Sequence, residues 1–238
     1  SLAMLDLGNV LSLEDIQKKV AERIAELPAG AAVFGFASYP NPALYKGLGW
    51  PTKEILDRVS PNNPVILLRR GGHALWVNSV ALQKSGITKE TKAPEGGEIV
   101  KDAETGEPTG ILKEAASSLL KVDNPSKPVE NIERALNHAA ALGLTGIHTG
   151  SYLKEIEIFK ELEARGKLTL RVYASLPIDG IDEYIKKGIK RGQGDDMVRI
   201  GFLKTFIDGT IGVRSALMFE PFAEEPGNTG LAQYKEED

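Results

Sequence analysis

Residues 129–148 decide the fold, with the sequence Val-Glu-Asn-Ile-Glu-Arg-Ala-Leu-Asn-His-Ala-Ala-Ala-Leu-Gly-Leu-Thr-Gly-Ile-His. Ile132 and Leu136 recur at the spacing of one helix face, and Gly143 is the residue type that ends a helix. The short apolar run 145–148 follows as a strand. A helix that leads directly into a strand is the repeating unit of parallel α/β sheets and barrels.

The same alternation extends in both directions along the chain. The sequence predicts helices at about 13–27, 52–59, 79–85 and 181–190, and another that places Ile156, Phe159 and Leu162 inward and stops at Gly166. Apolar runs predict strands at 31–36, 64–70, 168–176 and 198–208. Ser12, with Asp15 three residues on, is positioned to cap the first helix, and Asn78 to cap the third.

These elements predict an α/β fold, specifically a partial TIM (β/α)8 barrel of parallel strands. A complete barrel takes about 250 residues without inserts. This chain has 238, and part of it is assigned to an inserted small α/β and hairpin region at about 37–125. The turn-rich stretch 102–108 predicts the hairpin within that insert. We therefore expect residues 1–238 to form one incomplete barrel domain.

Composition indicates a folded protein with a small-molecule substrate. The chain is 42% hydrophobic, and its 29 Lys and Arg against 33 Asp and Glu give a net charge of −4. Nucleic-acid binding needs a basic face, so a nucleic-acid partner is not expected. The absence of cysteine excludes disulfides and thiolate metal sites and favours a cytoplasmic location. No apolar run reaches the roughly 18–20 residues of a membrane span, so no membrane partner is expected either.

Several ordered motifs resemble the YtcJ-like branch of the amidohydrolase superfamily (amidohydrolase family 3), a group of metal-dependent hydrolases. The resemblance runs from about residue 5 to 231. Its motifs are Gly72-His-Ala-Leu-Trp-Val-Asn-Ser-Val-Ala-Leu82, Thr105-Gly-Glu-Pro-Thr-Gly110, Gly143-Leu-Thr-Gly-Ile-His148, Phe202-Leu-Lys-Thr-Phe-Ile-Asp-Gly209 and Arg214-Ser-Ala216.

The resemblance implies a (β/α)8 barrel that holds one or two divalent metals, usually zinc, and hydrolyses amide or related C–N bonds. Its members take metal ligands from an H-x-H pair on the first strand, a lysine on the fourth, and later histidines and an aspartate. Lys204 falls on the lysine position. The chain matches the family only downstream of the H-x-H strand and upstream of the last strands, which is the pattern of a fragment.

Lys204 is the predicted metal ligand. A lysine amine that takes up carbon dioxide becomes a carboxylate-like bridge with the oxygen ligands that divalent metals accept. The alternatives are an ordinary lysine paired with a carboxylate, or a Schiff-base nucleophile of a barrel lyase.

Asp208 and Arg214 flank a glycine-rich turn after the same strand. Asp208 is the predicted catalytic group, and Arg214 could orient a substrate carboxylate or carbonyl through its planar fork. A turn aspartate and a structural salt bridge are the competing interpretations.

His73 and His148 are the predicted substrate-binding histidines. His73 follows an apolar strand and two glycines, and His148 ends a strand. The competing interpretation is a hydrogen-bonded loop histidine for His73 and a structural residue for His148.

The sequence therefore predicts part of a metal-dependent amidohydrolase, with zinc in the intact parent enzyme. The alternative is a folded, non-catalytic fragment that binds no metal. An open barrel exposes strand edges, which favours self-association.

Overall fold

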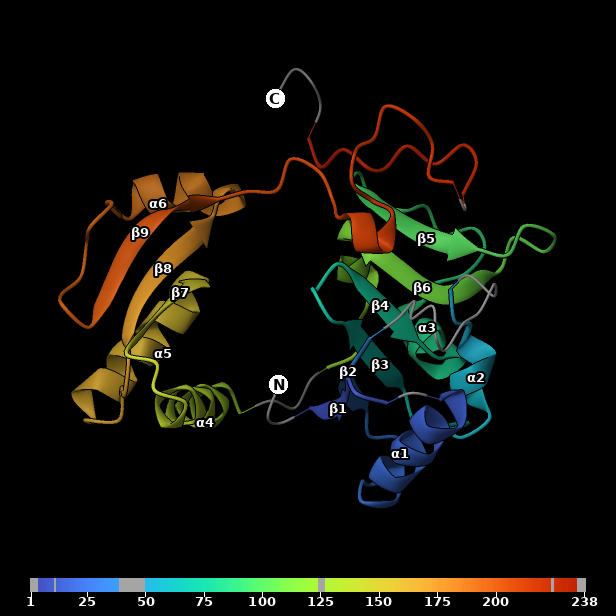
Figure 1. Ribbon diagram of the computed structural model, residues 1–238, viewed down its shortest axis with the longest axis horizontal. Coiled ribbons are helices and arrows are strands. Elements are labelled where there is room, and N and C mark those ends of the chain that lie inside the picture. Colours follow the sequence, from blue (N-terminus) through green and yellow to red (C-terminus); the bar gives the residue numbers. More distant parts are fainter. Residues whose placement is uncertain (1–3, 11, 39–49, 124–126, 224, 235–238) are drawn as a thin grey trace. The chain divides into compact units, whose positions relative to one another are not determined.

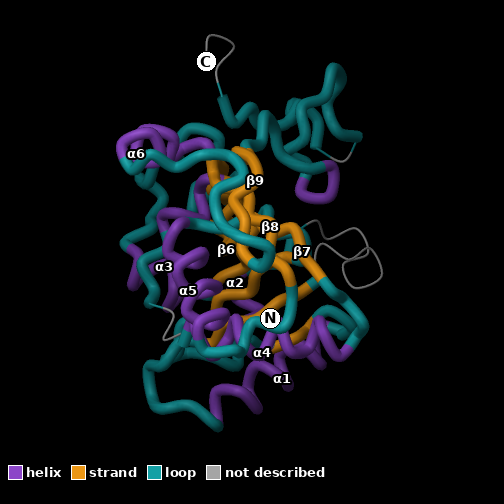
Figure 2. The backbone as a smooth tube through the Cα atoms, turned by 90° about the vertical axis from the view of Figure 1, so that its left-hand side faces the viewer, coloured by secondary structure: helices purple, strands orange, loops and turns teal. Residues whose placement is uncertain are grey.

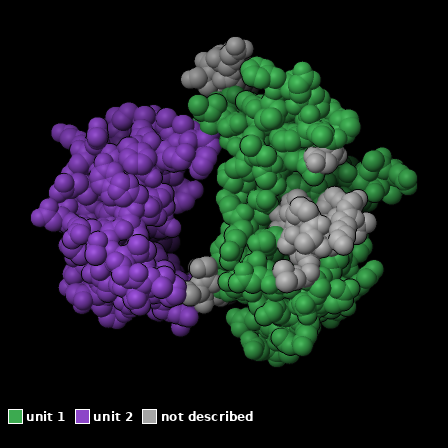
Figure 3. Space-filling view, viewed as in Figure 1, with its two compact units in different colours: residues 1, 3–124, 207–238 green, residues 2, 125–206 purple. Residues whose placement is uncertain are grey.

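The computed structural model describes residues 4–10, 12–38, 50–123, 127–223 and 225–234. The chain divides into two compact units, coloured separately in Figure 3. Unit 1 holds residues 3–124 and 207–238, and unit 2 holds residues 125–206.

Unit 1 is built on a six-stranded mixed sheet (Figure 1). Its strand order is β1 (Leu5–Leu7), β2 (Val33–Ala37), β3 (Val65–Arg69), β4 (Ala74–Val77), β6 (Pro108–Glu114) and β5 (Gly97–Lys101). β1, β2 and β3 are parallel, whereas β4, β6 and β5 each run antiparallel to their neighbours. The predicted hairpin is thus the β5–β6 pair.

Both faces of this sheet are covered, as the continuous apolar run of β3 predicted. Val65 and Leu67 pack in a core with residues of α1 (Leu13–Ala25) and α2 (Lys53–Asp57). Ile66, between them, packs in a second core with α3 (Ser79–Ser85). Alternate strand residues point to opposite faces, so each face receives its own apolar layer.

Local capping in unit 1 follows the sequence closely. The Ser12 hydroxyl accepts a hydrogen bond from the Asp15 amide at 3.0 Å. The Asn78 side chain accepts from the Ala81 amide at 3.1 Å and Gly86 ends α3 in the left-handed conformation. Such caps satisfy backbone groups that a helix end leaves unpaired.

Unit 2 is a three-stranded parallel sheet with helices on one face. Its strand order is β7 (Gly146–Gly150), β8 (Arg171–Pro177) and β9 (Val198–Lys204), and its helices are α4 (Pro128–Ala141), α5 (Leu153–Ala164) and α6 (Ile181–Lys186). Leu136 of α4 and Phe159 of α5 pack with Val172 of β8 and Val198 of β9 in one core. The predicted α/β class with parallel strands is confirmed.

The structure differs from the sequence prediction at three strands. β1 and β4 were not predicted, because three or four residues are too few to establish a period. β9 ends at Lys204 and not at Asp208. Its register with β8 ends at the pair Pro177–Lys204, and proline has no N–H with which to extend a ladder.

The last described segment, 207–234, belongs to unit 1 and is mostly loop (Figure 2). It contains the short 3-10 helix η3 (Ile211–Val213), and Asp208 forms an isolated antiparallel bridge with Ala232. This segment carries two of the five predicted site residues, Asp208 and Arg214.

Candidate functional site

Lys204 ends β9 in unit 2 and is exposed. Its ammonium donates to the Thr205 carbonyl at 3.0 Å and lies 4.0 Å from the centre of the Phe206 ring. No group of three or more His, Asp or Glu side chains within the described part of the chain could hold a metal ion. The described residues therefore do not fit a complete metal site, and Lys204 is a candidate for a single ligand.

His148 lies on β7 in an aromatic row that crosses all three strands of unit 2. Its ring centre is 4.9 Å from that of Tyr173 on β8, and Tyr173 is 6.1 Å from Phe202 on β9. The neighbouring residues Ile147 and Val172 face the helices. Because strand side chains alternate, the aromatic row lies on the opposite face of the sheet.

His73 lies in the tight turn between β3 and β4, where Gly71 and Gly72 take positive φ values of 107° and 86°. Its Nδ1 lies 3.0 Å from Glu114 Oε2. The Ser215 hydroxyl donates to the other carboxylate oxygen of Glu114. The side chain of Glu114 is 9% exposed, so its carboxylate is a nearly buried bridge between the two.

The side chains of Asp208 and Ser215 accept backbone hydrogen bonds within the loop 208–217. Asp208 Oδ2 accepts from the Leu217 amide at 2.9 Å, and the Ser215 hydroxyl accepts from the Thr210 amide at 3.0 Å. Gly209 packs so closely against Ser215 and Glu114 that a Cβ at this position would collide with both side chains. This glycine therefore permits the close approach of the turn to Glu114.

Arg214 belongs to a second charged cluster in unit 1. Its Nη1 donates to Glu225 Oε1 at 2.6 Å, and Asn228 Nδ2 donates to Glu225 Oε2, also at 2.6 Å. Lys113, only 1% exposed, lies 3.0 Å from Glu98 and 3.9 Å from Glu225. A buried lysine requires such partners, since an unpaired buried charge is strongly destabilising.

The pKa of Glu225 reflects this environment. Burial raises the pKa, but hydrogen bonds from Asn228 and Arg214, together with the charge of Lys113, outweigh burial and hold the pKa below its ordinary value of 4.5. Glu225 is therefore a carboxylate whose charged form the folded protein favours.

The structure thus gathers His73, Asp208 and Arg214 in unit 1, and Lys204 and His148 in unit 2. Sequence reasoning missed Glu114, Lys113, Ser215 and Glu225. The sequence feature that could have identified this site was the charged pair Lys113-Glu114 at the end of an apolar strand, because charged residues are unusual there. Ser215 lies 101 residues from Glu114, and Glu225 lies 112 residues from Lys113 (225 − 113), so no local pattern could identify these partners.

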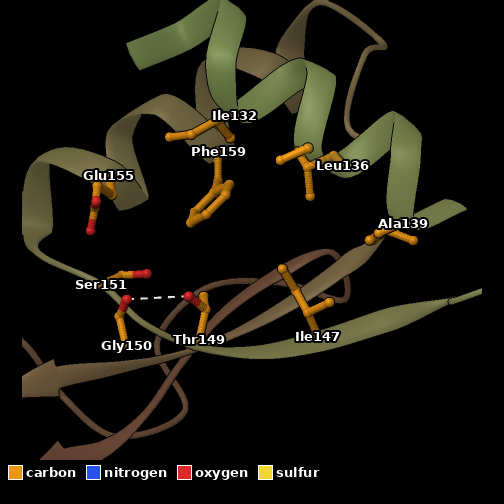
Figure 4. Close-up of a pocket in the computed structure, with 11 residues that line it drawn as sticks. Ile132, Leu136, Ala139, Ile147, Thr149, Gly150, Ser151, Glu155 and Phe159 are labelled. Carbon is orange, nitrogen blue, oxygen red and sulfur yellow. Dashed lines mark hydrogen bonds between the residues drawn. The ribbon is translucent and has the colours of Figure 1, made fainter. Parts of the chain in front are cut away.

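A cavity of about 230 Å³ lies between α4, α5 and β7 in unit 2 (Figure 4). Ile132, Leu136 and Phe159 form its apolar wall, and Ser151 and Glu155 lie at its polar end (Figure 4). None of the predicted site residues lines it. No helix within the described ranges is long and apolar enough to cross a membrane.

The amidohydrolase family model matches residues 1–238, and this chain belongs to that family. The family resemblance predicted from the motifs is confirmed. YtcJ of Bacillus subtilis (strain 168), an amidohydrolase by name, is 33% identical over 243 residues, which cover 98% of this chain and 45% of YtcJ.

An N-substituted formamide deformylase of Arthrobacter pascens is 38% identical over 127 residues, or 50% of this chain and 23% of that protein. A solved structure described as an uncharacterized metal-dependent hydrolase from Pyrococcus horikoshii OT3 is similar over 99% of this chain and 45% of its own, with a TM-score of 0.63 and 26% identity. The chain therefore spans less than half the length of YtcJ and of this hydrolase.

Proposed function

We propose that this chain is part of a (β/α) barrel of a metal-dependent hydrolase that cleaves amide or other C–N bonds of a small molecule. The observation that carries the proposal is Lys204 at the carboxyl end of β9, the third of three parallel strands. In barrels, active sites gather at this end of the strands. The Arthrobacter relative is named for the deformylation of N-substituted formamides, which fits an amide substrate.

In this proposal a carboxylated Lys204 would supply one ligand to a divalent metal, which we propose to be zinc. A divalent metal of this kind supplies Lewis-acid polarisation of a carbonyl and an activated water. In unit 1, Asp208 would move a proton, and His73 and Arg214 would contact substrate. In unit 2, His148 is the proposed substrate contact.

The second candidate is that this chain is a folded, non-catalytic fragment that binds no metal and turns over no substrate. It is favoured by the absence, within the described ranges, of any group of three or more metal-ligating side chains.

Metal loading of the purified chain separates the two. We would incubate the chain with Zn²⁺ and bicarbonate, remove unbound metal, and measure zinc by elemental analysis. The proposed function predicts bound zinc that Lys204→Ala removes and Lys160→Ala, an exposed lysine on α5, retains. Zinc at background in all three proteins would reject metal binding by this chain and favour the second candidate.

A further inference from the structure

Glu114 holds two parts of unit 1 together at the end of the β4–β6 ladder. Its amide donates to the His73 carbonyl at 3.0 Å, so the two residues lie opposite one another where the antiparallel strands end. Its carboxylate then contacts the His73 ring with one oxygen and the Ser215 hydroxyl with the other. The backbone and both carboxylate oxygens of one residue are therefore engaged.

The backbone of Glu114 is unusual. Its φ is +48°, a value that non-glycine residues rarely adopt. Such conformations are strained and persist only where the surroundings enforce them, commonly at functional sites. Here the enforcing contacts are the two side-chain hydrogen bonds and the close packing of Gly209.

The chemistry of these contacts fixes where the protons lie. A carboxylate has acceptors and no donor, so the proton between it and His73 is on Nδ1 of the histidine. A neutral imidazole with its proton on Nδ1 has its lone pair on Nε2. On the Ser215 side, the hydroxyl accepts from the Thr210 amide and donates to Glu114, so both of its roles are assigned.

We infer that Glu114 is a positioning residue: it sets His73 in the Nδ1–H tautomer and, through Ser215, fastens the 209–215 turn, which follows Asp208 and contains Arg214. Histidines that act as ligands or bases are commonly oriented by a carboxylate in this way. The inference deepens the proposed function, on which the role of His73 toward substrate rests. Neither the His73 tautomer nor the position of the turn depends on a bound metal.

The test uses ¹⁵N NMR of the imidazole rings in the metal-free chain, at a pH where the histidines are neutral. The chain has three histidines, so His73→Gln identifies the signal of His73. The wild-type protein is expected to have His73 protonated on Nδ1. His138 and His148, both in unit 2, serve as internal references.

Glu114→Gln and Ser215→Ala separate the two roles. In Glu114→Gln, the amide oxygen keeps the hydrogen bond from Ser215, and the amide NH₂ donates to Nδ1, so the His73 tautomer changes to Nε2–H. In Ser215→Ala, the tautomer is unchanged, while the Thr210 amide loses its acceptor and its hydrogen exchange accelerates about tenfold.

A wild-type His73 protonated on Nε2 would overturn the inference, even if Glu114→Gln failed to fold. An unchanged tautomer in a folded Glu114→Gln variant would overturn it as well. Because this readout needs neither metal nor substrate, its result is independent of the zinc measurement with Lys204→Ala. If zinc does not bind but the His73 tautomers are as expected, only the proposed function is rejected.

Discussion

At the scale of single residues, unit 1 depends on two acidic side chains that join distant parts of the sequence. Glu114 connects β6 to Ser215, and Glu225 connects Arg214 to the buried Lys113. Trp50 also donates from Nε1 to Glu225 Oε1 at 3.3 Å, and its ring lies 5.0 Å from the Lys113 ammonium. Segment 207–234 is thus attached to the sheet by a charge-assisted hydrogen bond from Ser215 to Glu114 and by the ion pair of Glu225 with Lys113.

Acid is therefore expected to weaken unit 1 through Glu225. Because the folded protein lowers the pKa of Glu225, its contribution to stability is fully present above the ordinary value of 4.5 and is lost as the pH falls through the lowered folded value. Glu225→Gln should reduce the free energy of unfolding at pH 7 by about 1–3 kcal/mol and make stability less dependent on pH below 4.5. Urea unfolding at pH 7 and at several acidic values measures both effects.

Glu220→Gln is the matched control, since Glu220 is an exposed acid of the same segment. It should leave the free energy of unfolding within about 0.5 kcal/mol of wild type. Equal losses in the two variants would show that the Glu225 cluster contributes nothing specific.

At the scale of elements, α4 and α5 pack incompletely against β7 in unit 2. The cavity of about 230 Å³ there leaves its apolar wall without part of its packing partners. Ala139 of α4 lines this cavity, whereas Ala141, at the end of the same helix, is exposed. The two alanines allow a matched comparison.

Ala139→Leu should fill part of the cavity and stabilise the protein by about 0.5–2 kcal/mol. Ala141→Leu adds the same atoms at an exposed position and should change stability by no more than about 0.5 kcal/mol. The midpoint of urea unfolding followed by circular dichroism distinguishes them. A destabilised Ala139→Leu would mean that the wall of the cavity cannot accommodate the added methyl groups.

The aromatic row of unit 2 depends on a glycine on β9. A Cβ on Gly201 would collide with the Tyr173 ring, whereas one on Gly146 would meet its nearest neighbour at an ordinary 3.4 Å. Gly201→Ala should therefore displace Tyr173 and cost about 1–3 kcal/mol, the range for overpacking. Gly146→Ala is the control and should cost less. Thermal unfolding, with near-ultraviolet circular dichroism to follow the tyrosine, measures the difference.

At the scale of the whole molecule, strand edges remain open. β7 and β9 each pair on one side only within the described residues, as do β1 and β5 in unit 1. Unpaired strand edges are templates for pairing with another chain. Phe202 and Leu203 on β9 are also exposed, at 47% and 42%. Self-association of the isolated chain remains our proposal.

Light scattering at micromolar concentration tests this proposal. We expect a mass above that of the 25.7 kDa chain. Replacing Phe202 with Lys on the edge strand should shift the distribution toward monomer, because charged side chains oppose edge pairing. A wild-type protein that is monomeric throughout this concentration range would contradict the proposal.

The sequence by itself determined the helices, the longer strands and the family. Helix caps at Ser12 and Asn78, the continuous apolar run of β3 and the βα repeat of residues 129–208 are local patterns, and local backbone and packing preferences express them directly. The motifs that identified the amidohydrolase family are also contiguous stretches of sequence, so they can be recognised without the tertiary structure.

Only the tertiary structure decided which polar groups meet. It grouped the chain into two compact units, added the short strands β1 and β4, and joined His73 to Ser215 through Glu114. These contacts connect residues 41 and 101 positions apart. Hydrogen bonds of this kind form when folding brings strand ends and loops together, so the sequence supplied the chemical groups and the fold supplied their pairing.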